Sequence, residues 1–274
     1  MERTITTDLQ DDDIDTINRP TGELRLEPSP RRVRTIFNDV AVADSKRAML
    51  LLEPKRLPVY YFPRDDVRID LLEPSGRTVD GPTRGPAAYY HLRVGDRSAS
   101  DAAWAHADPP RGAEALADLI AFRWDLLDAW YEEDDEVFVH PRDPYHRVDV
   151  LHSSRHVKVV AGGQVIAETH RPRLLFETGL PTRYYIPKVD VRMDLLRRTD
   201  SETACPYKGT AIYWSLMRDG EELIHDIAWS YPRPIPETPK IENLVCFYNE
   251  RVDEIWVDGE LQSRPTTRWT GPAR

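Results

Sequence analysis

Residues 204–214 read Ala-Cys-Pro-Tyr-Lys-Gly-Thr-Ala-Ile-Tyr-Trp, a stretch that combines a thiol, an amine and three aromatic rings. Residues 80–90 read Asp-Gly-Pro-Thr-Arg-Gly-Pro-Ala-Ala-Tyr-Tyr and share its proline, a glycine, an alanine and a tyrosine at the same relative positions. Gly81 stands in place of Cys205, and an arginine stands in place of Lys208. The stretch is therefore one copy of an internal repeat, and the copies differ at the most reactive side chains.

The repeat extends well beyond these residues. Residues 31–91 align without a gap on residues 155–215, and about a third of the aligned positions are identical, several times the share that average composition gives by chance. The similarity continues, after one inserted residue, as far as residues 119–128 against 244–253. A repeat of this length predicts two tandem domains of one fold, because a solenoid would need at least three short units.

Composition and patterning favour strands over helices. The chain has 23 prolines and 13 glycines, which favour fixed turns. Gly162-Gly163 between two valine-rich runs predicts a hairpin, and the alternation of Val191, Met193 and Leu195 with charged residues predicts a half-buried strand. Further strands are expected over residues 210–217, 223–229 and 253–261, and helices only over 112–124 and, more weakly, 239–248. The expected fold class is mainly β, with two tandem domains of antiparallel sheets and at most a short helix in each.

The repeat and the flanking composition give the expected organisation of the chain. The N-terminal residues are polar and acidic and have no apolar periodicity, which is typical of a mobile arm. We expect an acidic arm at 1–24, a divergent first β domain at 25–139, a linker motif at 140–150, a second β domain at 151–262 and a C-terminal tail at 263–274.

Charge and cysteine content limit the class of protein. A net charge of -10 argues against nucleic-acid binding, because phosphate neutralisation needs a basic face. The 2 cysteines are too few for a disulfide scaffold, which favours a reducing, cytoplasmic location. No stretch approaches the length of about 20 apolar residues that a membrane-spanning helix requires, so no membrane association is expected. The oligomeric state is left open.

Cys205 and Lys208 are the candidate catalytic residues of the repeat. Cys205 precedes a proline in a predicted turn, and the nearby Lys208 ammonium would favour the thiolate, which is the nucleophilic form. The alternative is a small apolar residue packed in a turn, because free cysteine is among the most buried residue types. Cys246, between apolar neighbours, is expected in the core.

Aromatic and charged residues of the second copy form a candidate ligand-binding set. Aromatic rings with a convergent charge suit a small planar or cationic ligand, although aromatic residues on strands are more often core. Arg192 and Asp194 would either bind a polar ligand or form a structural ion pair, and the first copy repeats them as Arg68 and Asp70. The candidate ligand-binding residues are Tyr184, Tyr185, Arg192, Asp194, Tyr213, Trp214, Asp226 and Trp229.

The linker between the copies is rich in histidine. Residues 140–156 hold four of the 8 histidines, but their spacing matches no standard zinc motif, so no metal site is expected. His146 is a candidate acid or base. His140, Arg142 and Arg147 are candidates for binding an anion.

Several common signatures are absent from the sequence. It contains no Gly-x-Gly-x-x-Gly run, no phosphate-binding Gly-x-x-x-x-Gly-Lys-Ser/Thr loop, no Gly-x-Ser-x-Gly elbow and no Cys-x-x-Cys pair. The sequence therefore indicates no particular cofactor.

Dispersed motifs carry a resemblance to a known family. They read His-Pro-Arg-Asp-Pro-Tyr-His-Arg-Val-Asp at 140–149, Arg-Tyr-Tyr-Ile-Pro at 183–187, Cys-Pro-Tyr-Lys-Gly at 205–209, Asp-Ile-Ala-Trp-Ser-Tyr-Pro at 226–232 and Val-Asp-Gly-Glu at 257–260. In this order they resemble the domain of unknown function 427 family, over about 31–140 as a divergent copy and about 146–262 as a close one.

The resemblance implies a β-tent fold, in which two antiparallel sheets meet at an angle, similar to methionine sulfoxide reductase B and the cereblon ligand-binding domain. By analogy a ligand would lie in the aromatic cleft between the sheets. Some β-tent relatives bind zinc through paired cysteines, which this chain lacks, so zinc is not carried over. The family also carries a nucleotidyltransferase-like label, but no acidic pair in a Gly-Ser context supports that activity here.

Three classes of function follow as expectations. The first is a module that binds a small polar or planar metabolite in an aromatic pocket of the second domain. In a variant of this hypothesis the module also converts the metabolite chemically. The second is a cysteine-dependent or nucleotidyltransferase-like enzyme. The third is a non-catalytic structural or interaction protein. A reactive Cys205 would favour the second class, and ligand binding that survives Cys205→Ser would favour the first.

Overall fold

The structure, a computed structural model, describes residues 24–54, 56–81 and 84–270. The predicted mobile arm lies, apart from Leu24, outside the described residues. The chain divides between Asp143 and Pro144 into two compact units, which we call the first unit and the second unit.

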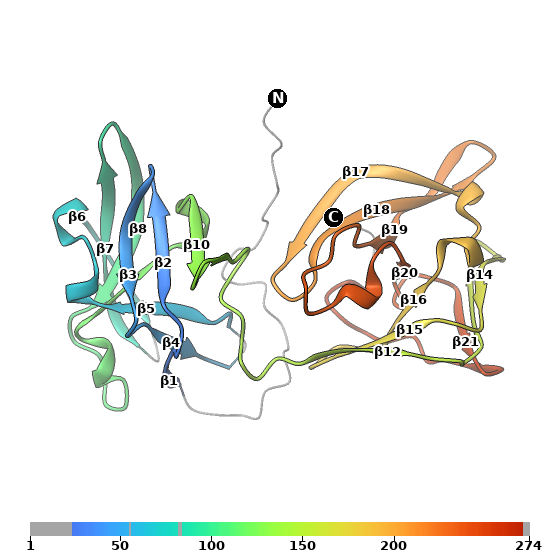
Figure 1. The fold of residues 1–274 in the computed structure, drawn as a ribbon, viewed down its shortest axis with the longest axis horizontal. Coiled ribbons are helices and arrows are strands. Elements are labelled where there is room, and N and C mark those ends of the chain that lie inside the picture. Colours follow the sequence, from blue (N-terminus) through green and yellow to red (C-terminus); the bar gives the residue numbers. More distant parts are fainter. Residues whose placement is uncertain (1–23, 55, 82–83, 271–274) are drawn as a thin grey trace. The chain divides into compact units, whose positions relative to one another are not determined.

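The first unit is built from two antiparallel sheets (Figure 1). Within the described residues, its larger sheet has seven strands in the order β1-β4-β5-β9-β8-β7-β6, with bounds Arg25–Pro28, Met49–Leu52, Val59–Pro63, Leu119–Phe122, Arg97–His106, Gly85–Val94 and Leu72–Gly81. Its smaller sheet has the order β11-β10-β2-β3, with bounds Asp135–Glu136, Ala129–Glu132, Val33–Phe37 and Val40–Ser45. Short 3-10 turns cover Arg64–Asp66, Ile69–Leu71, Glu114–Leu116 and Trp124–Leu126.

The second unit repeats this arrangement strand for strand. Its larger sheet has the order β12-β15-β16-β20-β19-β18-β17, with bounds Val148–His152, Arg173–Glu177, Arg183–Ile186, Val245–Phe247, Glu221–Ser230, Gly209–Arg218 and Leu196–Cys205. Its smaller sheet has the order β14-β13-β21-β22, with bounds Gln164–Thr169, Val157–Ala161, Glu254–Val257 and Glu260–Leu261. The 3-10 turns are Lys188–Asp190, Met193–Leu195 and Pro239–Ile241. The predicted mainly β fold with duplicated antiparallel sheets is confirmed.

The hydrophobic core of the second unit lies between its two sheets. Buried Val157, Val159 and Ala161 alternate with half-buried residues along β13, as expected for a strand with one face on a core. The larger sheet contributes Ile186 and Phe247 to the same cluster. The predicted hairpin around Gly162-Gly163 is confirmed as the β13–β14 pair.

The other face of the larger sheet is also covered. Tyr185, Tyr213, Trp229, Tyr231 and Tyr248 form a buried group on this face, which we call the outer aromatic cluster. Ile241 belongs to the same group, and Trp269 packs against it. Aromatic side chains bury large areas, so this second cluster adds substantially to the stability of the sheet.

The helix predicted over 112–124 is wrong, as is its weaker twin over 239–248. The first segment forms one 3-10 turn, Glu114–Leu116, and then enters β9, whose four residues are all buried. The second forms the turn Pro239–Ile241 and then β20. A run of helix-forming residues this short gains little from its own hydrogen bonds, so pairing in the middle of a sheet outweighs local propensity.

The strand predicted from the alternation of Val191, Met193 and Leu195 is also wrong. Met193 and Leu195 form a 3-10 turn, while Val191 makes an isolated bridge to Ala167 of β14. The backbone N–H of Arg192 donates to the carbonyl oxygen of Ile166 at 2.8 Å. Val191, Met193 and Leu195 all pack on the core, although they lie in successive turns of the backbone. Their spacing of two residues therefore resembles that of a half-buried strand.

Residues 263–270 form no regular element but pack on the second unit. The Thr267 hydroxyl donates to Glu250 Oε1 at 2.6 Å, and Arg264 Nη2 donates to the carbonyl oxygen of Val252 at 2.7 Å. The described part of the predicted C-terminal tail is therefore a docked segment. Across the described ranges, no helix has the length and apolar character needed to cross a membrane.

Candidate functional site

The candidate site is built around the end of the β17–β18 hairpin, the long curved pair of strands in Figure 1. Cys205 is the last residue of β17 and pairs with Gly209, the first residue of β18. Gly209 has φ +101°, and a Cβ on it would lie 2.9 Å from the carbonyl oxygen of Arg233. The backbone N–H of Ile235 donates to the carbonyl oxygen of Lys208 at 3.2 Å. Only glycine suits this close approach, which holds the hairpin end against residues 233–235.

Three buried ionisable side chains form a hydrogen-bonded chain beside this hairpin end. Lys208 Nζ donates to Glu177 Oε2 at 2.5 Å. Glu177 Oε1 lies 3.0 Å from His146 Nε2, and the exposed fractions of these two side chains are 6% and 7%. The His146 ring packs on Tyr207 of the hairpin turn, with ring centroids 4.3 Å apart. Residues from three separate segments therefore meet at one place.

The contacts between Glu177 and Lys208 stabilise the charged forms of both side chains. Burial alone would raise the pKa of Glu177, but the Lys208 charge and the hydrogen bonds from His146 and Lys208 lower it to about 2. Burial alone would lower the pKa of Lys208, but its electrostatic interactions with Cys205 and Glu177 and its hydrogen bond to Glu177 outweigh burial and raise that pKa. Glu177 is therefore a carboxylate, and Lys208 an ammonium, at neutral pH.

His146 has one hydrogen-bonding atom to spare. Its Nε2 faces Glu177, whereas its Nδ1 is buried and has no hydrogen-bond partner among the described residues. Most buried polar atoms in folded proteins have a hydrogen-bond partner, so this ring nitrogen is an acceptor or donor that the described residues leave unused.

The two cysteines have different environments. Cys205 is partly exposed and lies within electrostatic range of Lys208, Tyr185 and Tyr231. Cys246 is fully buried, and burial raises the pKa of its thiol to about 12. The prediction that Cys246 is a core residue is confirmed, and Cys205 is the thiol that a reagent could reach.

The predicted aromatic set is split between the two faces of the larger sheet. Tyr185, Tyr213 and Trp229 belong to the outer aromatic cluster, and Trp229 Nε1 donates to the Tyr185 hydroxyl at 3.1 Å. Tyr184 lies in the core between the sheets. Trp214 follows Tyr213 along β18 and so points to the opposite face, with Lys188 Nζ 5.4 Å from its ring centroid. The aromatic residues do not line one common pocket.

The outer aromatic cluster already holds a cation of its own. The Arg183 guanidinium lies 5.6 Å from the Trp229 ring centroid and 5.4 Å from that of Trp269. Both of its terminal nitrogens donate to Glu250, each at 2.7 Å, and the exposed fractions of the two side chains are 5% and 0%. A cationic ligand would have to displace Arg183, so this cluster is explained by the fold alone.

The remaining charged candidates lie elsewhere. Arg192 and Asp194 pair with each other at 2.6 Å and are more than half exposed, as are Arg68 and Asp70 in the first unit at 2.7 Å. They therefore form a repeated surface ion pair, the structural alternative for these residues. Arg147 pairs with Asp149 at 2.7 Å on the surface of the second unit.

Three further candidates are held by local contacts or lie in the other unit. Asp226 has φ +46° and accepts a hydrogen bond from the Thr199 hydroxyl at 2.7 Å, at a position where Asp101 has φ +52° in the first unit. Both units therefore have an aspartate with positive φ at this position, which indicates a role of Asp226 in the backbone conformation of the fold. His140 and Arg142 precede the division of the chain and belong to the first unit, where His140 Nδ1 lies 2.7 Å from the carbonyl oxygen of Pro141.

The first unit contains a partial copy of the site. Glu53 lies 3.4 Å from Arg84, as Glu177 faces Lys208 in the second unit. Trp104 Nε1 donates to the Tyr61 hydroxyl at 3.0 Å, which repeats the contact of Trp229 with Tyr185. The ion pair and the Trp–Tyr contact therefore belong to the shared fold, whereas the thiol is specific to the second unit.

Glu177 is the residue that sequence reasoning missed. A signal was present, because Glu177 and Glu53 are identical at aligned positions of the repeat. A charge shared by both copies at the end of an apolar strand needs a partner, and the aligned Lys208 and Arg84 provide one.

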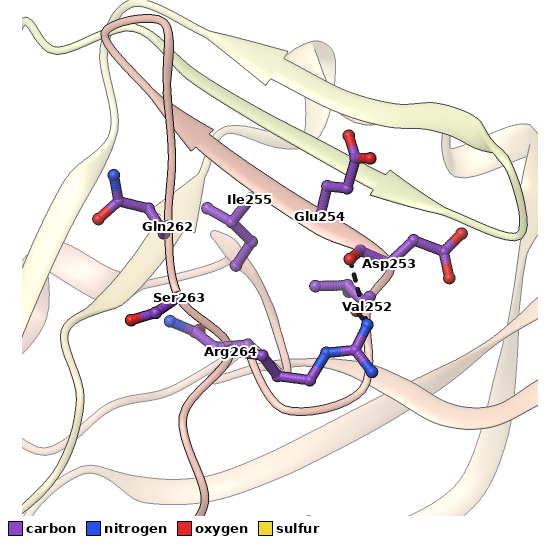
Figure 2. Close-up of a pocket in the computed structure, with 8 residues that line it drawn as sticks. Val252, Asp253, Glu254, Ile255, Gln262, Ser263 and Arg264 are labelled. Atoms are coloured by element: carbon purple, nitrogen blue, oxygen red, sulfur yellow. Dashed lines mark hydrogen bonds between the residues drawn. The ribbon is translucent and has the colours of Figure 1, made fainter.

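A small pocket lies between β21 and the docked C-terminal segment (Figure 2). It is lined by Asn249, Val252, Asp253, Glu254, Ile255, Gln262, Ser263 and Arg264. Its volume of about 20 Å³ is room for about one water molecule, which is too small for a metabolite. Among the residues with described positions, no group of three or more His, Cys, Asp or Glu side chains is arranged to hold a metal ion.

Comparison with known families identifies the repeat. The model of the family described as a domain of unknown function (DUF427) matches residues 25–133 and again residues 149–258. The chain belongs to the DUF427 family. Each DUF427 match spans most of one unit, and the second includes Glu177, Cys205 and Lys208. His146 precedes the second DUF427 match, so this side chain comes from outside the repeated segment. None of the curated proteins matches the chain.

Proposed function

We propose that the second unit binds a small polar ligand at the end of the β17–β18 hairpin, with Lys208, His146 and Cys205 around it. The observation that carries this proposal is the buried chain of Lys208, Glu177 and His146, whose last nitrogen has no partner in the described part of the protein. Burying a polar atom without a hydrogen-bond partner is costly. A ligand that forms a hydrogen bond with His146 Nδ1 accounts for this atom.

The differences between the two units also support a ligand site at the end of the β17–β18 hairpin. The first unit keeps the ion pair as Glu53 and Arg84 but has Gly81 where the second unit has Cys205. Its fold is therefore complete without the thiol. We assign the fold-supporting role to the ion pair and the ligand contacts to the groups that the second unit adds.

The ligand is polar because the atoms available to it are polar. Lys208 supplies N–H donors, His146 a ring nitrogen and Cys205 a thiol. A flat polar metabolite would form hydrogen bonds with these groups. Neither cysteine is disulfide bonded, so we place this activity in the reducing cytoplasm.

Native mass spectrometry of the protein purified from its own host tests the proposal. We expect the wild type to retain a small molecule that is released on denaturation. Lys208→Arg should lose it, because a planar guanidinium directs its donors differently from an ammonium. Cys205→Ser should keep it. Absence of any retained molecule, or equal retention by the wild type and Lys208→Arg, would contradict the proposal.

A cysteine-dependent enzyme is the second candidate, and the position of Cys205 favours it. This thiol is partly exposed and lies near the Lys208 ammonium, so it is accessible to a substrate as a nucleophile must be. In this version the bound metabolite is also transformed, and Cys205→Ser abolishes turnover while binding persists.

A further inference from the structure

We propose that Glu177 is a positioning residue that holds His146 with its hydrogen on Nε2, so that Nδ1 accepts a hydrogen bond from an N–H or O–H of the ligand. This inference rests on the proposed function and specifies the ligand as a hydrogen-bond donor at this point, such as an amide or a hydroxyl compound.

The first step is the state of the Glu177 carboxylate. Both of its oxygens are occupied, Oε2 by Lys208 Nζ at 2.5 Å and Oε1 by His146 Nε2 at 3.0 Å. The Lys208 ammonium keeps this carboxylate ionised at neutral pH. An ionised carboxylate can only accept hydrogen bonds, so the hydrogen between Oε1 and Nε2 is carried by His146.

The second step concerns the other ring nitrogen. The proposal requires a neutral His146 ring, which carries one N–H, so that with this hydrogen on Nε2 the lone pair lies on Nδ1. His146 Nδ1 is buried and has no hydrogen-bond partner within the part of the chain that the structure describes. A buried acceptor without a partner is costly, so a ligand donor that reaches it gains a hydrogen bond without losing a competing one.

The third step is the orientation of the ring. His146 packs on Tyr207 with centroids 4.3 Å apart and an interplanar angle of 34°. Tyr207 belongs to the same hairpin turn as Lys208, so the ring is held from one side by the turn and from its edge by Glu177. A fixed ring aims its free nitrogen in one direction, as preorganised binding sites require.

The first unit provides a matched control. Glu53 faces Arg84 there as Glu177 faces Lys208, and that segment lies within the first family match, whereas His146 lies outside the second. Glu53→Gln therefore perturbs the corresponding pair of the first unit and leaves the Glu177 and Tyr207 contacts of His146 in place.

The tautomer can be measured directly with protein carrying ¹⁵N-labelled histidine. Long-range ¹H–¹⁵N spectra at neutral pH, assigned with His146→Gln, should show a protonated Nε2 and an unprotonated Nδ1 for His146. Glu177→Gln should reverse this, because Lys208 binds the amide oxygen and the amide N–H₂ then donates to Nε2. Glu53→Gln should leave the His146 signals unchanged.

A wild-type His146 with its hydrogen on Nδ1, with hydrogens on both ring nitrogens, or with both tautomers equally populated, would overturn the inference even if Glu177→Gln does not fold. The ligand class is tested by titrating the wild type with acetamide and with N,N-dimethylacetamide, which has the same carbonyl but no N–H. Acetamide should shift the Nδ1 resonance, and dimethylacetamide should not. Equal shifts, or none with acetamide, would reject the donor class.

These outcomes separate the inference from the proposed function. A retained metabolite together with the wrong tautomer would refute only the role of Glu177. The expected tautomer without any retained metabolite would refute only the proposed function, because the tautomer is read from the protein without a ligand.

Discussion

Lys208 donates a 2.5 Å hydrogen bond to Glu177 from the end of the β17–β18 hairpin. The first unit forms the corresponding pair with Arg84 and Glu53. Because both copies keep the pair, it supports the fold. Only the second unit has a thiol beside the pair, and this is where we propose that a ligand binds. Variants of the two pairs therefore separate stability from ligand binding.

Glu177→Gln should destabilise the second unit strongly. It leaves the buried Lys208 ammonium without its counter-charge, and breaking a buried pair in this way costs about 3–5 kcal/mol. Urea denaturation at neutral pH measures the loss. The double variant Glu177→Gln/Lys208→Met should recover part of it, and a single variant within about 0.5 kcal/mol of the wild type would show that the pair is not buried as described.

The stability of the protein should depend on pH through Glu177. Its pKa in the folded state is lowered from 4.5 to about 2, so the carboxylate stabilises the fold above its unfolded pKa. This contribution is lost as the pH falls from about 4.5 toward about 2. Urea unfolding at several pH values in this window should show a shallower decline for Glu177→Gln than for the wild type, whereas parallel curves would contradict the assignment.

Lys208→Arg should keep the fold and lose the ligand. The first unit shows that an arginine is compatible with a hairpin end of this kind, so the cost in unfolding free energy should be about 1 kcal/mol, from the larger side chain in a packed site. Thermal unfolding and native mass spectrometry measure the two effects separately. A variant that unfolds at room temperature would indicate that the two hairpin ends are not equivalent.

Cys205 should react with iodoacetamide at pH 7 at least about 10-fold faster than Cys246, because only an accessible thiolate reacts. Burial raises the pKa of Cys246 to about 12 and removes it from solvent, which makes it an internal control. Peptide mass spectrometry over time gives both rates. A Cys205 as slow as Cys246 would exclude the cysteine-dependent enzyme.

Gly209→Ala should be more costly than Gly163→Ala. Both glycines have positive φ, but a Cβ at Gly209 would meet the Arg233 carbonyl oxygen at 2.9 Å, while one at Gly163 would have no atom within 4 Å. We expect about 1 kcal/mol for Gly163→Ala, from backbone strain alone, and about 3 kcal/mol for Gly209→Ala. Equal losses in urea denaturation would mean that residues 233–235 yield to the new methyl group.

The repeat made the fold predictable, because two similar copies of strand-like segments require two similar sheet assemblies. The candidate site was only partly predictable. Cys205, Lys208 and His146 were named as candidates from residue type and position, but the hydrogen bonds that join His146 and Lys208 through Glu177 depend on contacts between β15 and two other segments of the chain. Neighbouring aromatic residues such as Tyr184 and Tyr185 were grouped together, although successive side chains of a strand point to opposite faces.

The sequence left two alternatives open for some charged residues. Arg192 and Asp194 form an ion pair with each other on the surface, and a sequence pattern does not distinguish such a pair from two residues that bind a ligand. The predicted helix over 112–124 failed in part because Leu119–Phe122 is a central strand of the larger sheet, where pairing on both sides decides the conformation.

Cys205 pairs with Gly209 in the same register in which Gly81 pairs with Gly85. The backbone thus presents this position identically whether it carries a thiol or only a hydrogen atom. A change of side chain there requires no change of main-chain path. A point mutation at this end of the hairpin can therefore add or exchange a reactive group in one unit. The fold of both units stays the same.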